Sequence, residues 1–278
     1  MSIIIEELDE LVDRHGDERR THIDPMPLSM DREDLVAEQA IVISLTQDNY
    51  IRHLPAEAFR LQNRGGKGLK GVTTKEEDTP AKIVTCFSKD RLLIFTDQGR
   101  VYGLRAWETP RASRYGRGSH IRNLLGRIRD DEKVVSMLPM DRELIEDPDG
   151  HFLLFATRKG LIKKTSLREY VKINRNGKYA LRLKIHGDSL VNVRSGTNDS
   201  DIVMISSTGQ ASRFACSEIT ATSRNTAGVW GIFTGDRETS SRKGDGGHVV
   251  GMVVADNYET QILTITVNGM GKRTIIGS

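Results

Sequence analysis

The sequence feature that most constrains the fold is a hairpin-like pattern that occurs five times. In each copy a short apolar run leads into a tight turn and then into a second strand-like run. Asparagine or glycine at the turn tolerates the positive φ that a tight hairpin requires. The apolar runs are 41–45, 92–95, 152–155, 202–205 and 262–265, and the turn residues are Asn49, Gly99, Gly160, Gly209 and Gly269.

The turn residues recur at intervals of about 50 to 60 positions, which indicates a repeat protein. A further strand-like run follows each of the first four hairpins, at 82–87, 133–138, 190–193 and 248–254. A four-stranded repeat of this length has the size of one propeller blade. We therefore predict an all-β, propeller-like fold over residues 41–278, with four complete repeats and a fifth that has begun.

A glycine-rich basic loop follows the first hairpin, and weaker copies follow the next three. Gly68, Gly118, Tyr179 and Gly228 lie at one constant offset from the first four turn residues, so the loops keep the phase of the hairpins. Glycine allows the backbone to approach another surface closely. Neither standard phosphate-loop spacing occurs. The fullest copy is Gln62, Asn63, Arg64, Gly65, Gly66, Lys67 and Gly68.

Charge divides the chain into an acidic leader and a basic body. Residues 1–40 contain 12 Asp and Glu against 4 Arg, a net charge of −8, whereas the remainder carries 37 Lys and Arg against 26 acids, a net charge of +11. A basic body predicts a polyanionic partner. The leader is expected to form a helix over about 3–15, followed by a proline-containing connector, because Ile4, Leu8, Leu11 and Val12 share a helical spacing.

Cations recur in the second strand of each hairpin and in the loops. Equivalent positions around a propeller rim would form a continuous basic path for a bent polyanion, since neutralising phosphates needs no base contacts. For the strand cations alone, protection of an exposed sheet edge is the alternative. The predicted DNA-binding residues are Arg52, Arg64, Lys67, Lys70, Arg100, Arg105, Arg114, Arg117, Lys163, Lys164, Arg175, Lys178, Arg213, Arg224, Lys272 and Arg273.

No catalytic or metal-ligating pattern is found in the sequence. The seven histidines form no H-E-x-x-H motif, and no G-x-S-x-G elbow is present. Cys86 and Cys216 lie far apart in the sequence and are expected to be reduced and structural. We expect no catalytic residues, metal, cofactor or small-molecule substrate in this chain. No apolar run is long enough to span a membrane and no signal peptide is evident, so a cytoplasmic location is expected.

The heptapeptide 62–68 resembles the box of the C-terminal domain family of DNA gyrase A, with Asn63 as the one departure from that pattern. Segments 50–55, 97–102 and 157–165 are similar to that family too, and 16–21 resembles the end of the catalytic core that precedes the domain. The resemblance implies a six-bladed β-pinwheel whose blades exchange strands with their neighbours, and of which this sequence begins five repeats. It also implies that residues 1–40 are the tail of the core and its linker.

The resemblance further implies a function and partners. The domain would wrap duplex DNA without sequence specificity and support ATP-dependent negative supercoiling by a holoenzyme of two A and two B subunits, in the nucleoid-associated cytoplasm. The cleaving tyrosine, Mg²⁺ and ATP would be used elsewhere in that holoenzyme. Two alternatives stay open: the equivalent domain of topoisomerase IV, and a propeller that serves as a protein-interaction scaffold.

Overall fold

The computed structural model describes residues 2–17, 21, 33–59, 79–113, 116–234, 246–257 and 259–276. The chain divides into two compact units, Met1–Leu35 and Val36–Ser278. The first contains α1 (Ser2–His15), where the sequence predicts a helix. The second starts a few residues before the predicted boundary, because Ser88 Oγ donates a 2.7 Å hydrogen bond to Ala37 O and thereby ties this segment to the sheets.

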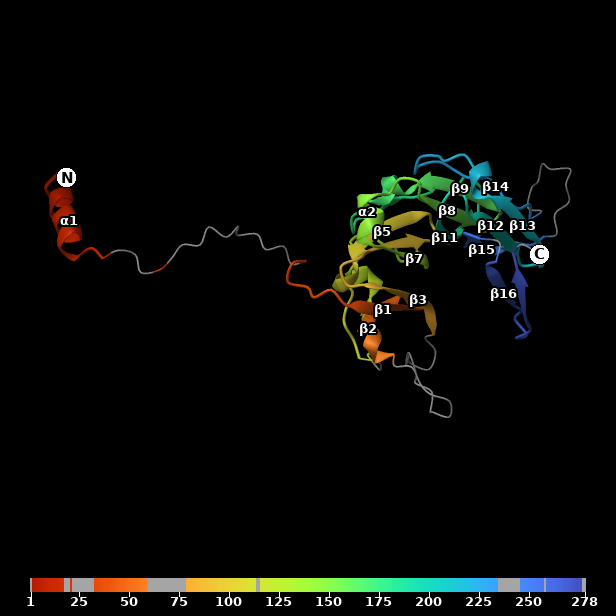
Figure 1. Cartoon of the computed structure of the whole chain (residues 1–278), viewed down its shortest axis with the longest axis horizontal. Helices are drawn as coiled ribbons and strands as arrows, with labels where there is room; N and C mark the ends of the chain where they lie inside the picture. Colours follow the sequence, from red (N-terminus) through yellow and green to blue (C-terminus); the bar gives the residue numbers. More distant parts are fainter. Residues whose placement is uncertain are drawn as a thin grey trace. The chain divides into compact units, whose positions relative to one another are not determined.

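The second unit is built from five antiparallel hairpins, each followed along the chain by the next (Figure 1). All five predicted turn residues have positive φ, at 62°, 74°, 99°, 86° and 80° in chain order, which confirms the turn prediction. The hairpins are β1 (Ala40–Thr46) with β2 (Tyr50–Pro55), β4 (Arg91–Thr96) with β5 (Arg100–Arg105), β8 (Phe152–Thr157) with β9 (Leu161–Ser166), β12 (Asp201–Ser206) with β13 (Ala211–Ala215), and β16 (Gln261–Ile265) with β17 (Gly271–Ile275).

A third strand pairs with the first strand of each of the first four hairpins. These strands are β3 (Pro80–Phe87), β7 (Val134–Met140), β11 (Leu190–Gly196) and β15 (Val249–Ala255). They contact one another in the order β3, β7, β11, β15, so they form the inner edge that consecutive sheets share. Short helical turns follow the first four hairpins as η1 (Ala56–Ala58), η2 (Ala106–Glu108), η4 (Leu167–Tyr170) and η5 (Cys216–Glu218); η3 (Ile121–Asn123) and α2 (Arg142–Glu146) lie in connections.

The outer edge of each of the first three sheets is supplied by the following repeat. Three two-residue strands do this: β6 (Ser119–His120) pairs with β2, β10 (Lys178–Tyr179) with β5, and β14 (Val229–Trp230) with β9. The sheet orders are β3-β1-β2-β6, β10-β5-β4-β7, β11-β8-β9-β14, β13-β12-β15 and β16-β17 among the described residues. The propeller-like fold with strand exchange is therefore confirmed.

The sheets stack face to face, and one hydrophobic cluster fills each junction. Along β4, Leu92 and Ile94 pack toward the first sheet, whereas Leu93 and Phe95 pack toward the third. A strand that is buried on both faces reads as a continuous apolar run, because successive side chains point to opposite faces. This packing explains why the sequence shows unbroken apolar runs at the hairpins and no strict alternation of apolar and polar residues.

Two of the phased loop glycines allow close approach between repeats. A Cβ at Gly118, which has a φ of +80°, would lie 2.4 Å from Ile51 O, and one at Gly228 would lie 2.3 Å from Ile162 O. Either contact would push the exchanged strand away from its sheet. The glycines are therefore required by the backbone path between neighbouring blades.

The structure corrects the sequence prediction for Arg52 and Lys163, which were expected on a basic rim. Both lie at the third position after a turn, and their side chains are buried, at 2% and 1% exposure. Arg52 Nη1 donates to Ser113 O at 3.2 Å and to Gly116 O. Lys163 Nζ donates to Arg224 O at 2.7 Å. In both repeats the cation holds the backbone of the exchanged segment that arrives from the next repeat.

The fourth position after the turn has a similar role in the third and fourth repeats. Lys164 is also buried, contrary to the rim prediction, and its Nζ donates to Cys216 O at 2.9 Å. Arg213 Nη1 donates to Ile276 O at 2.6 Å. Both acceptors occupy the same position relative to the turn residue of the following repeat. These cations therefore connect consecutive blades through charge-assisted hydrogen bonds to buried carbonyls.

We predict that Lys163→Ala lowers the stability of the domain, because Arg224 O loses its ammonium donor inside the protein. An unpaired buried acceptor costs about 1–3 kcal/mol, so the free energy of unfolding should fall by about 2 kcal/mol in a chemical denaturation experiment. Lys184→Ala, at an exposed lysine of the same repeat, is the matched control and should be nearly neutral. Equal stabilities for the two variants would contradict this role.

We also predict a pH dependence of stability that requires Lys163. Burial lowers the pKa of this ammonium from 10.5 to about 8. Between about pH 8 and pH 10.5 the unfolded chain therefore binds a proton that the folded chain lacks, so the contribution of Lys163 to the free energy of unfolding rises with pH. As the pH rises from about 8 to 10.5, the free energy of unfolding of the unmodified chain should therefore increase relative to that of Lys163→Met. A difference that is independent of pH would refute the prediction.

Candidate nucleic-acid interface

The outer edges of the first three sheets are covered by segments that arrive from the following repeat. We call residues 109–129, 170–187 and 219–234, apart from 114 and 115, the exchange segments; they contain β6, β10 and β14. In each sheet the exchanged strand lies at the edge opposite to β3, β7 or β11. Because those inner strands contact one another, the exchange segments lie on the side of three consecutive blades that faces away from the inner edge.

The exchange segments contain no acidic residue. Each begins directly after a glutamate, Glu108, Glu169 or Glu218, and the first two end before Asp130 and Asp188. The loop after the first hairpin follows the same rule, because 58–75 has no acid after Glu57. Because each segment lacks acids, its own net charge is positive, although Arg122 pairs with Asp130 just outside its segment at 2.6 Å.

Several exposed cations of the exchange segments were not among the predicted DNA-binding residues. The predicted set was selected by fixed offsets from the turn, whereas the signal that these cations share is the length over which acids are missing. That second signal would have identified them from the sequence alone. The additional exposed cations are Arg111, Arg122, Arg127 and Arg129 in the second repeat, and Lys172, Arg182 and Lys184 in the third.

Besides Arg175, two of the predicted residues lie on these outer edges with exposed side chains. Arg117 stacks its guanidinium over the ring of Tyr50, with 3.7 Å between Cζ and the ring centroid. Lys178 belongs to β10 and is exposed. Both residues follow the sequence prediction in position and exposure. Lys272 and Arg273 are exposed too, but they lie on β17, outside the exchange segments.

Arg175 and Arg224 form equivalent ion pairs between repeats. Both lie 15 residues after the turn residue of their own repeat. Each pairs with a glutamate of the preceding repeat, the one that stands directly before that repeat's own exchange segment. Arg175 pairs with Glu108, and Arg224 Nε lies 3.4 Å from Glu169 Oε2. These arginines bridge neighbouring blades, and the exchange segment 219–234 contains Arg224 as its one cation. Positive charge on the outer edge therefore decreases sharply at the fourth repeat.

The other described candidates are engaged by neighbouring groups. Arg100 Nη1 lies 3.1 Å from Glu132 Oε1, whose side chain is fully buried. Arg213 Nη2 lies 2.8 Å from Asp201 Oδ2, and Arg105 is half-buried beside Glu108. The following candidates lie outside the described residues: the box residues Gln62, Asn63, Arg64, Gly65, Gly66, Lys67 and Gly68, together with Lys70 and Arg114.

The described residues hold no assembled metal or thiol chemistry. No group of three or more His, Cys, Asp and Glu side chains in these parts of the chain could hold a metal ion. Cys86 and Cys216 are unpaired and buried, and burial raises the pKa of the Cys86 thiol to about 12. None of the helices in the described ranges has the length and apolarity needed to span a bilayer.

Comparison with known proteins places this arrangement in a family. A family model described as the DNA gyrase C-terminal domain, β-propeller, matches residues 40–86, 90–139, 151–195, 200–256 and 260–274. The chain is 40% identical over 277 residues to the DNA gyrase A subunit of Staphylococcus epidermidis strain ATCC 12228, and 38% identical over 276 residues to that of Staphylococcus aureus strain COL. The alignments cover 99% of this chain but 29% and 30% of those relatives.

Solved structures show the same fold. The crystal structure of the C-terminal domain of DNA topoisomerase IV aligns with a TM-score of 0.64 and 23% identity, over 87% of this chain and 69% of that one. The structure of a DNA gyrase A C-terminal domain aligns with a TM-score of 0.64 and 22% identity, over 84% of this chain and 71% of that one. Each of the five ranges that the family model matches contains one of the five hairpins, apart from Ile275 at the end of the last. On this match the chain belongs to the β-propeller family of DNA gyrase C-terminal domains.

Proposed function

We propose that this chain binds duplex DNA without sequence specificity and bends it along the outer edges of consecutive blades. The observation that supports the proposal is the run of acid-free, cation-bearing exchange segments on the outer edges of neighbouring sheets. Phosphates neutralised by Lys and Arg release condensed counterions, and this term is independent of base sequence. A curved series of basic edges suits a bent duplex, because the contacts then offset the cost of bending.

The proposed contacts are concentrated in the first three repeats. Exposed cations of the second and third repeats lie on two successive outer edges, whereas the exchange segment 219–234 of the fourth repeat offers Arg224, which is paired with Glu169. By sequence, the loop 58–75 carries the same character into the first repeat, through Arg64, Lys67 and Lys70. The proposed DNA path therefore runs over the N-terminal part of the domain and ends near the fourth blade.

We further propose that the domain acts within a gyrase A chain in supporting ATP-dependent negative supercoiling. In this proposal the rest of gyrase A, together with the B subunits, supplies strand cleavage, Mg²⁺ and ATP hydrolysis, and residues 1–40 belong to the tail of the catalytic core. This division of roles requires no catalytic residue or cofactor site from the chain itself. Its place of action would be the nucleoid-associated cytoplasm.

Two alternatives differ from this proposal in what they predict. Membership of topoisomerase IV is not distinguished by fold, because both structural comparisons have a TM-score of 0.64. The 38–40% identity to gyrase A subunits over 99% of the chain favours gyrase. A protein-interaction scaffold would have no affinity for DNA at moderate salt, which the basic exchange segments argue against.

DNA wrapping is tested by incubating the chain with singly nicked plasmid, sealing the nick with ligase, removing protein and measuring the linking number. We expect a shift of the topoisomer distribution that grows with protein concentration, because a bent or coiled path is trapped on ligation. Albumin at the same concentration is the control. An unchanged distribution at protein excess in low salt would contradict wrapping, and retained DNA affinity would then reduce the function to binding.

The outer-edge assignment is tested with the triple variant Lys172→Gln, Lys178→Gln and Arg182→Gln. If these side chains neutralise phosphates, the slope of log K against log salt should become shallower by about 2 to 3. The matched control is Arg142→Gln, Arg168→Gln and Arg194→Gln, which removes three exposed charges outside the exchange segments. Equal slopes for the two triple variants would place the DNA elsewhere on the domain.

A further inference from the structure

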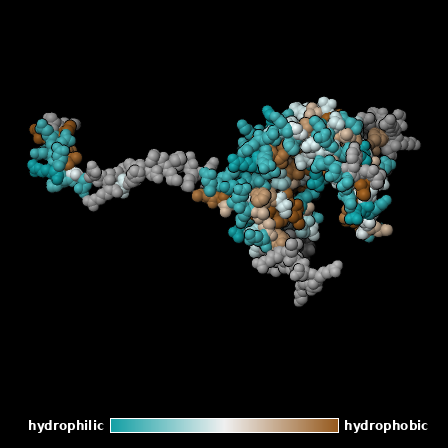
Figure 2. Space-filling view, in the orientation of Figure 1, coloured by the Kyte–Doolittle hydropathy of each residue, from teal (hydrophilic) through white to brown (hydrophobic). Residues whose placement is uncertain are grey.

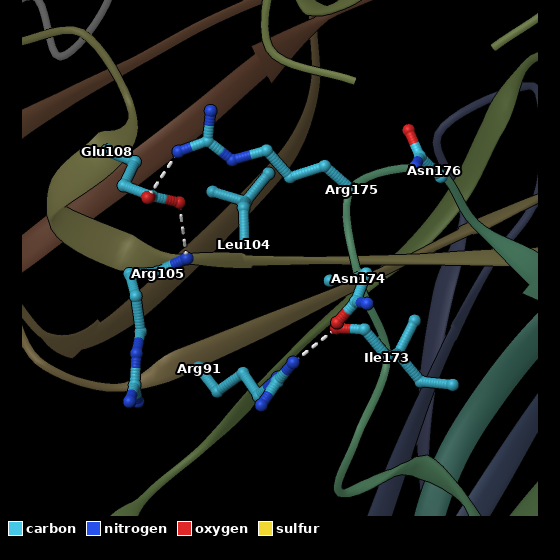
Figure 3. Close-up of a pocket in the computed structure, with 9 residues that line it drawn as sticks. Arg91, Leu104, Arg105, Glu108, Ile173, Asn174, Arg175 and Asn176 are labelled. Atoms are coloured by element: carbon cyan, nitrogen blue, oxygen red, sulfur yellow. Dashed lines mark hydrogen bonds and ion pairs between the residues drawn. The ribbon is translucent and has the colours of Figure 1, made fainter. Parts of the chain in front are cut away.

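The junction between the second and third blades contains a cavity of about 360 Å³ (Figure 3). One wall is the end of β5 and η2, with Leu104, Arg105 and Glu108, and Arg91 from the start of β4 lies beside it. The other wall is formed by residues 173–176, which lie in the exchange segment 170–187. The two walls come from different repeats, so the cavity exists only when the blades are stacked.

Three arginines line this cavity against one glutamate. Arg91 donates to Ile173 O across the junction, and Arg175 forms its ion pair with Glu108, as Figure 3 shows. Arg105 Nη1 donates to Lys89 O over 3.4 Å, and its backbone N–H donates to Glu108 Oε2 at 2.9 Å. The cavity therefore carries an excess of positive charge.

Two of the arginines that line the cavity, Arg91 and Arg105, form a pair that the other four hairpins lack. Arg91 and Arg105 are direct cross-strand partners in the β4–β5 hairpin. Like charges placed directly opposite each other destabilise a sheet. The equivalent partners in the other four hairpins are Ile41 with Pro55, Phe152 with Ser166, Asp201 with Ala215, and Gln261 with Ile275.

The preceding junction provides an internal comparison. An equivalent cavity of about 620 Å³ lies between the first two blades, and among the described residues its charged lining consists of Glu57 and Arg111. The fold thus forms a cavity at this place without the arginine pair. At the second junction Arg91 holds Ile173 O, but a second arginine directly opposite it has no counterpart at the first junction. A bound anion would screen the repulsion between the two guanidinium groups.

We propose that this cavity binds a phosphodiester group of the DNA backbone, an inference that rests on the proposed function. Guanidinium groups bind phosphate oxygens with paired, charge-assisted hydrogen bonds. The wall 173–176 lies inside the acid-free segment 170–187, between the exposed Lys172 and Lys178. A duplex that follows this outer edge therefore brings its backbone to the cavity.

Glu108 has a defined role in this proposal. It holds Arg175 across the junction in the absence of DNA, and the incoming phosphate competes for that guanidinium. Glu108→Gln removes the competing charge, while its amide oxygen still accepts from the Arg105 backbone N–H. Arg105→Gln instead removes a cationic partner of the phosphate and the like-charge pair with Arg91. The two substitutions should therefore change DNA affinity in opposite directions.

The test measures the affinity of the chain for a nonspecific duplex as a function of chloride concentration. Arg105→Gln should make the slope of log K against log salt shallower by about 1. Glu108→Gln should bind more tightly than the unmodified chain. Arg142→Gln, at an exposed arginine of α2, is the control and should match the unmodified chain. Weaker binding by both cavity variants, or an Arg105→Gln slope equal to the control, would overturn the proposal.

Two further measurements separate this inference from a structural role of the arginine and from a site for free phosphate. Thermal melting without DNA should show Arg105→Gln to be at least as stable as the unmodified chain, because the substitution removes the like-charge pair with Arg91. A lower melting temperature would indicate a structural arginine and overturn the inference. Inorganic phosphate, compared with chloride at equal ionic strength, should displace DNA more from the unmodified chain than from Arg105→Gln, because both anions would occupy the same guanidinium groups. Phosphate that raises the melting temperature of the unmodified chain but not of Arg105→Gln, and that does not compete with DNA, would assign the cavity to a free phosphate anion and overturn the phosphodiester assignment. Absence of DNA binding by the unmodified chain would instead refute the proposed function itself.

Discussion

The structure depends on a hydrogen bond that links the turn of one hairpin to the exchange segment of the next repeat. Asn49 O accepts from Ile121 N at 2.9 Å, Gly99 O accepts from Ala180 N at 2.9 Å, and Gly160 O accepts from Gly231 N at 2.9 Å. These donors lie 22, 20 and 22 residues after the turn residue of their own repeat. The chain therefore leaves one turn and returns to the previous turn over a path of nearly constant length. A path of nearly constant length keeps the loops in phase with the hairpins.

The position of a cation relative to the exchange segments divides the positive charges into two classes. Cations in the second hairpin strand, such as Arg52, Lys163 and Lys164, point into the junction and hold carbonyl groups of the next repeat. Cations on the exchange segments, such as Arg117 and Lys178, remain exposed on the outer edge. In the hairpin of β16 and β17, Leu263 and Ile265 are exposed. Figure 2 shows hydrophobic atoms on the part of the surface that this hairpin forms.

The sequence predicts the structure accurately where a local rule determines the conformation. Positive φ at Gly99 and its equivalents, strand runs at each hairpin and the phase of the loops all depend on residues close together in the chain. Strand exchange was implied by the family resemblance, but the residue pattern did not locate the exchanged strands, because β10 (Lys178–Tyr179) has two residues and no hydrophobic pattern of its own. Arg175 was correctly selected as a member of a phased series, but its partner Glu108 lies in another repeat and could not be identified from spacing.

The sequence by itself determined that this is a repeat protein of β-hairpins with a basic body, because apolar period, turn residues and charge are properties of the chain. Only the tertiary structure decided which cations face solvent. Arg52 and Arg117 both stand near glycine-rich loops in a basic sequence, yet the first is buried against Gly116 O and the second lies exposed over Tyr50. The physical reason is strand exchange: the environment of a side chain in one repeat is set by the backbone of the next, which no local pattern records.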